Sequence, residues 1–126
     1  MGRLYAYRDK SPRIAASAVL FDSAEVTGDV VIGEGSIIGP GAMIHGCHLG
    51  AGTVVEPAAI VCDSSRVGAG SVIRAGACVK QRARFDDRAV LDGFPTVQVG
   101  SLDAEPGRPA WAFDLEDLPT PLPVAP

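Results

Sequence analysis

The sequence predicts an all-β protein, a parallel β-helix of about five triangular coils built from hexapeptide repeats. Two observations carry this prediction: an aliphatic residue recurs every six positions, and a small residue follows it four places later. A large inward side chain at every sixth residue would fill a triangular interior. Coils of 18 residues would then stack at about 4.8 Å, the spacing between paired strands.

The hexads begin at Ile14 and are interrupted once. They read "IAASAV", "LFDSAE", "VTGDVV", "IGEGSI", "IGPGAM" and, after a five-residue step, "LGAGTV", "VEPAAI", "VCDSSR", "VGAGSV", "IRAGAC", "VKQRAR", "FDDRAV", "LDGFPT". An amphipathic helix does not explain them, because a period of six is no multiple of 3.6 and the 15 glycines would destabilise helices. Glycines between strands instead supply the backbone angles that a sharp coil corner needs.

Composition narrows the classes of protein. The 126 residues suit one domain, and the net charge of −4 with scattered basic residues argues against a nucleic-acid partner. No stretch approaches the roughly 20 apolar residues of a membrane span, so we expect no membrane partner. Residues 1–14 contain no apolar run of signal-peptide length. The three cysteines are an odd number and do not indicate a disulfide framework. We therefore expect a cytoplasmic protein.

The two ends of the chain depart from the repeat. We assign residues 1–100 to the β-helix, with residues 1–13, which include Tyr5 and Tyr7, as an N-terminal cap. Residues 101–126 hold six of the ten prolines and the only tryptophan. This C-terminal segment is expected to form a short helix over 108–118 that packs on a face of the prism, or an extended proline-rich tail.

The five-residue step "IHGCH" at 44–48 shortens one coil from 18 residues to 17. Stacking then predicts columns of side chains on successive coils. One column is Thr27, His45, Cys62 and Lys80; a second is Asp29, Cys47, Ser64 and Arg82; and Glu56 lies beside Arg74. His48 falls in the small-residue slot of the shortened hexad, which predicts that its side chain points partly inward.

Three segments carry a resemblance to a known family. "PRIAASAVLFDSAEVTGDVVIGEGSIIGPGAM", "MIHGCHLGAGTVVEPAAIVCDSSRVGAGSVIRAGACV" and "DGFPTVQV" together span about residues 12–99. They resemble the γ-class carbonic anhydrase-like family of hexapeptide-repeat proteins, down to the short step at the HGC motif. The resemblance implies a left-handed β-helix and a homotrimer with parallel prism axes.

The resemblance also implies what the site should contain. Active members of that family hold zinc between two subunits with three histidines, and the HGC histidine is one of them. Here His45 matches that position, but Pro40 stands five residues earlier where a second ligand would be. The only other histidine is His48. The metal triad is therefore degraded, and we expect no cofactor; zinc at His45 with rebuilt ligands, such as His48, Cys47, Cys62 and Asp63, is an alternative.

We expect a homotrimer that binds or acts on an unidentified small molecule in the cleft between subunits, around His45, His48, Cys62 and Glu56, without hydrating CO2. Three alternatives stay open beside it. They are a metal-dependent lyase with rebuilt ligands, a hexapeptide-repeat acyltransferase with His45 or His48 as general base, and a non-catalytic assembly subunit. Cys47, next to both histidines, could act as a nucleophile. The competing interpretation is that the histidines only hydrogen-bond at a corner of the scaffold.

Overall fold

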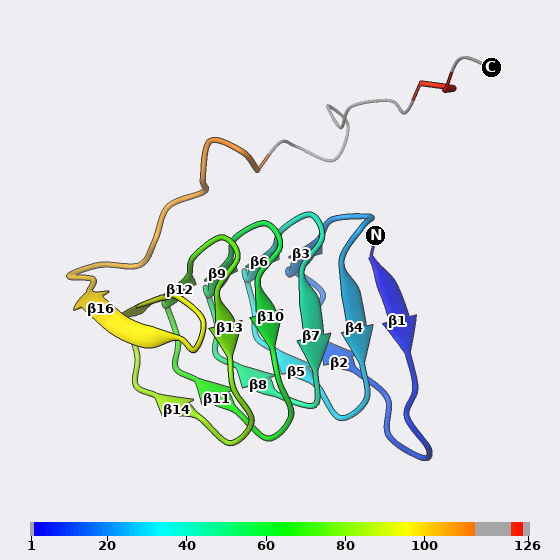
Figure 1. Ribbon diagram of the computed structural model, residues 1–126, viewed down its shortest axis with the longest axis horizontal. Coiled ribbons are helices and arrows are strands. Elements are labelled where there is room, and N and C mark those ends of the chain that lie inside the picture. Colours follow the sequence, from blue (N-terminus) through cyan, green and yellow to red (C-terminus); the bar gives the residue numbers. More distant parts are fainter. Residues whose placement is uncertain (1, 113–121, 125–126) are drawn as a thin grey trace.

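The computed structural model describes residues 2–112 and 122–124. Within them the chain winds as a left-handed parallel β-helix, and each full coil contributes one short strand to each of three sheets (Figure 1). The described residues form strands, bends and turns and no helix. The predicted fold class is therefore confirmed.

The three sheets run along the prism, and all their strand pairs are parallel except the last one in sheet III. Sheet I contains β1 (Arg3–Tyr5), β4 (Glu25–Thr27), β7 (Met43–His45), β10 (Ile60–Val61) and β13 (Cys78–Val79). Sheet II contains β2 (Arg13–Ile14), β5 (Val31–Ile32), β8 (His48–Leu49), β11 (Arg66–Val67) and β14 (Arg84–Phe85). Sheet III contains β3 (Val19–Leu20), β6 (Ile37–Ile38), β9 (Val54–Val55), β12 (Val72–Ile73), β15 (Ala89–Asp92) and β16 (Val97–Ser101).

The core follows the hexads. Its aliphatic members are the first residues of the repeats, fully or nearly buried: Leu20, Val26, Ile32, Ile38, Ile44, Leu49, Val55, Val61, Val67, Ile73, Val79 and Leu91. The small residues four places on are buried as well, and some of them carry hydroxyls. The Ser71 hydroxyl donates to the Gly68 carbonyl at 2.8 Å and accepts from the Ala89 amide at 3.1 Å. A buried hydroxyl is tolerated there because its hydrogen bonds are made within the scaffold.

The short step at 44–48 is absorbed at the corner between sheets I and II. Thr27 pairs with His45 before the corner, and Val31 pairs with His48 after it. The column from Thr27 to His45 is confirmed, and the pairing of Val61 with both Ile44 and Val79 continues it to Cys62 and Lys80.

The predicted column of Asp29, Cys47, Ser64 and Arg82 is wrong at Cys47. The Cys47 carbonyl accepts a hydrogen bond from the Val31 amide at 3.0 Å. One coil earlier, the Val30 carbonyl accepts the equivalent bond from the Arg13 amide. Cys47 therefore occupies the inward slot between Val30 and Ser65. His48 lies on the outer face, paired with Val31 and Arg66, so the expectation that it points inward is also wrong. The short coil therefore has one residue fewer in its turn. Cys47, the fourth residue of the step, takes the inward position that the fifth residue takes in a full hexad.

The described segments before and after the hexads contact the coils. β1 pairs with β4 and adds a strand to sheet I, while Tyr5 and Tyr7 stay 44% and 57% exposed. β16 pairs antiparallel to β15. The chain then returns along the outside of the prism, where Trp111 and Ala112 pack against Phe21, which follows β3, and Ile37 of β6.

Two expectations concern the C-terminal segment and membranes. Of the helix expected over 108–118, residues 108–112 are not helical and 113–118 lie outside the described residues. In the described part of the chain no helix is long and apolar enough to cross a membrane.

Candidate functional site

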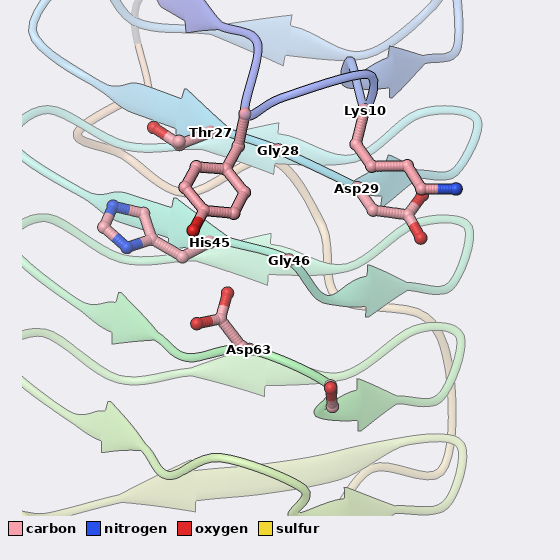
Figure 2. Close-up of a pocket in the computed structure, with 9 residues that line it drawn as sticks. Lys10, Thr27, Gly28, Asp29, His45, Gly46 and Asp63 are labelled. Atoms are coloured by element: carbon pink, nitrogen blue, oxygen red, sulfur yellow. The ribbon is translucent and has the colours of Figure 1, made fainter.

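An open pocket of about 470 Å³ lies at the corner between sheets I and II (Figure 2). Its walls come from β4, β7, the turn after β10 and the N-terminal loop. The lining residues are Tyr7, Lys10, Thr27, Gly28, Asp29, His45, Gly46, Asp63 and Ser64. The pocket thus gathers an imidazole, an ammonium group, two carboxylates and several hydroxyls.

Strand register places the side chains of the central wall. Thr27 and His45 end β4 and β7 and are direct partners on neighbouring coils. Their predecessors Val26 and Ile44 are fully buried. Because successive side chains of a strand point to opposite faces, Thr27 and His45 face outward into the pocket. His45 is half-buried there.

The upper wall is the loop between β1 and β2. The Tyr7 amide donates to the Lys10 carbonyl at 2.8 Å, and the Lys10 amide donates back to Tyr7 at 3.0 Å. The Gly28 amide donates to the Tyr5 carbonyl at 2.9 Å and ties the start of this loop to the corner. The tight loop therefore holds Tyr7 and Lys10 at the edge of the pocket.

The structure explains why the HGC motif has a glycine at position 46. Its φ is +52°, in the left-handed region that favours glycine. A Cβ at this position would collide with Oδ1 of Asp63. The Asp63 carboxylate thus lies directly against the Gly46 backbone, on the same wall as the His45 imidazole (Figure 2).

The two histidines face different hollows. A second hollow, of about 210 Å³, lies around the corner on sheet II and contains His48. Its lining residues are Asp29, Gly46, His48, Ser64, Ser65, Arg66 and Arg84. Asp29, Gly46 and Ser64 line both hollows, so the two hollows adjoin at the corner.

The other two predicted site residues lie outside the pocket. Cys62 follows β10 next to the His45 column and is half-buried; its burial and the neighbouring Cys78 raise the pKa of its thiol. Glu56 follows β9, at the corner between sheets III and I, where its carboxylate accepts from the Ala75 amide at 3.0 Å. The structure therefore does not bring Glu56 together with the histidines, and in the described residues it makes no ion pair with Arg74.

Cys47 is part of the core. Its side chain is 0% exposed, and burial raises the pKa of its thiol to about 12. A nucleophile must be accessible and deprotonated near neutral pH. The structure contradicts the expectation of a nucleophilic Cys47.

The donor set of this chain does not fit the zinc site that the resemblance implies. Among the described residues, no three His, Cys, Asp or Glu side chains are placed to hold one metal ion. His45 has Asp63 beside it, whereas His48 lines the hollow on the other sheet. The described side chains of this chain therefore do not support a zinc-dependent step.

Sequence reasoning missed the contribution of Tyr7 and Lys10. These residues precede the first hexad, so the repeat says nothing about their position. The one signal in the sequence was the extended stretch at residues 3–5, which can add a strand to sheet I and carries the following loop over the corner.

Fold and repeat together define the class: the chain is a hexapeptide-repeat, left-handed β-helix protein. No family model matches it. The carnitine operon protein CaiE of Escherichia coli K12 is 34% identical over 74 residues, which are 59% of this chain and 38% of CaiE. The chain thus spans well under half the length of this relative.

Solved structures share the fold at low identity. Serine acetyltransferase of Neisseria gonorrhoeae, in complex with serine, superposes with a TM-score of 0.63 and 20% identity over 71% of this chain and 40% of its own. LpxA of Bacteroides fragilis, a UDP-N-acetylglucosamine acyltransferase, has a TM-score of 0.61 and 19% identity over 67% of this chain and 32% of its own. Likeness at this level concerns the fold alone.

Proposed function

We propose that the protein is a γ-carbonic anhydrase-like homotrimer that binds and acts on a small molecule in the His45 pocket, without zinc-dependent CO2 hydration. One observation carries the proposal: the HGC histidine faces an open pocket beside Asp63, Thr27 and Lys10. Pro40 stands where the resemblance calls for another ligand. The three free cysteines support a reducing, cytoplasmic setting.

The pocket offers acid-base chemistry. An imidazole is the side chain that most often transfers protons at neutral pH. Asp63 lies on the same wall and could orient the ring, and Lys10 supplies a positive charge at the rim. The pocket is open on one side, so a second subunit of the trimer would complete it and exclude water from the ligand.

Ligand binding tests this assignment. A panel of carboxylate, amine and acyl-thioester metabolites would be screened by thermal shift with the parent protein and with His45→Ala. Compounds that stabilise the parent should lose their effect in His45→Ala and keep it in Glu56→Gln, the control on another corner. Compounds that stabilise His45→Ala as well as the parent would overturn the site.

Metal analysis separates the proposal from a lyase with rebuilt ligands. Protein purified without an affinity tag should contain less than about a tenth of an equivalent of zinc per chain, because a catalytic zinc site needs about three protein ligands. About one zinc per trimer interface, together with CO2 hydration, would instead establish the metal-dependent lyase.

Acyl transfer is a second candidate. The observation that favours it is His45 on the outer face of the coils with the Asp63 carboxylate close by, the arrangement of a base and an orienting group. The test is release of free thiol from acetyl-coenzyme A in the presence of amine or hydroxyl acceptors. Release that is lost in His45→Gln would support it; release that is unchanged would eliminate it.

A further inference from the structure

Basic side chains form a column on the outer face of sheet II. The strand register places five residues in line on successive coils: Arg13, Val31, His48, Arg66 and Arg84. Neighbouring members are about 4.8 Å apart at the backbone. His48, Arg66 and Arg84 together border the second hollow.

The two arginines of this hollow are unpaired. Within the described residues, neither Arg66 nor Arg84 makes a hydrogen bond or an ion pair through its side chain. The one carboxylate that lines this hollow, Asp29, pairs with Arg13 at 3.6 Å. Like charges directly opposite each other on paired strands are destabilising. An anion between them would remove that repulsion.

We infer that this hollow binds a phosphate-bearing group, and that a pyrophosphate fits it best. A guanidinium presents paired donors that match phosphate oxygens, and two of them on adjacent rungs suit two linked phosphoryl groups. His48 and the hydroxyl of Ser64 border the same space.

Because the two hollows adjoin at the corner, the inference extends to the substrate class. Asp29, Gly46 and Ser64 line both, so one ligand can place its phosphates on Arg66 and Arg84 and its other end at His45. The substrate is then a phosphorylated small molecule, such as a nucleoside diphosphate or another pyrophosphate ester. This second half rests on the proposed function of His45; the anion site itself does not.

Isothermal titration with inorganic pyrophosphate at low salt tests the anion site. Arg66→Gln and Arg84→Gln should each weaken binding by about tenfold, the loss expected for one charge-assisted contact. Arg74→Gln is the matched control, because Arg74 is also exposed but lies at the corner between sheets III and I. It should retain the parent affinity. Thermal unfolding of each variant checks that the fold is intact.

The outcomes distinguish the anion site from the ligand that spans the corner. Equal weakening in all three arginine variants, or none in Arg66→Gln and Arg84→Gln, would overturn the anion site. His45→Ala should leave pyrophosphate binding unchanged, and loss of it there would also overturn the site. ADP should bind more tightly than pyrophosphate, and His45→Ala should remove that gain. If ADP gains nothing, the corner-spanning ligand is wrong while the anion site stands.

Discussion

At the scale of single residues, Gly46 connects the scaffold to the pocket. Its positive φ turns the corner, and its missing side chain leaves room for Asp63. Gly46→Ala should lower the free energy of unfolding by about 1–2 kcal/mol through backbone strain and also displace the Asp63 carboxylate. Gly35→Ala is the control: Gly35 has a φ of +69°, and a Cβ added there would meet no atom within 4 Å. Thermal unfolding should show a loss of stability in both Gly46→Ala and Gly35→Ala. Loss of ligand binding should occur only in Gly46→Ala.

Cys47 should make stability depend on alkaline pH. Burial raises the pKa of its thiol from 9.0 to about 12, so the folded state holds the proton where the unfolded state releases it. Its contribution to stability is full below about pH 9 and is lost as the pH rises towards 12. Melting temperatures of the parent and Cys47→Ser at neutral and alkaline pH would measure this. The parent should lose more stability than the serine variant; equal losses would contradict the burial of the thiol.

At the scale of elements, the repeat predicts which residues enter the core and which coils neighbour each other. Ile44 and Leu49 are buried, and Thr27 pairs with His45, as the hexads predict. The spacing does not reveal where the short coil loses its residue. The repeat places Cys47 beside Ser64, whereas the chain shortens its turn and buries Cys47, which keeps the inward slot between Val30 and Ser65 filled.

The pocket was predictable only in part. The HGC motif points to His45, and its register reaches Cys62, but the motif does not say which hollow each histidine faces. His48 lies beyond the corner with Arg66, and Glu56 lies at a different corner. The loop of Tyr7 and Lys10 depends on a pairing between β1 and β4 that lies outside the repeat.

The returning C-terminal segment should stabilise sheet III. Trp111 packs on Phe21 with ring centroids 5.7 Å apart, and Ala112 is buried beside them. Trp111→Ala should lower the free energy of unfolding by about 2 kcal/mol, since it removes apolar burial and an aromatic pair. Chemical denaturation followed by circular dichroism would measure the change. Val124→Ala, at a residue that is 94% exposed, should have no effect; an equal effect would show that the packing does not matter.

At the scale of the whole molecule, we expect the proposed homotrimer to use the outer face of sheet I. Met43 and Ile60 lie in register beside the His45 column, and Met43 is 38% exposed. Light scattering should give a mass of about three times the 13.0 kDa of one chain. Met43→Glu should reduce it to the monomer mass by placing a charge in the interface. Val97→Glu, on exposed β16, should remain trimeric. A monomeric parent would remove the intersubunit cleft.

The reversed direction of β16 has a consequence for length. A parallel β-helix has no natural end, because the edge of each coil offers a template for another. β16 lies on that edge in sheet III with the opposite polarity, so it satisfies β15 without presenting the start of a further parallel coil. In sheet III the edge of the last coil is therefore covered by a strand that does not continue the coiling.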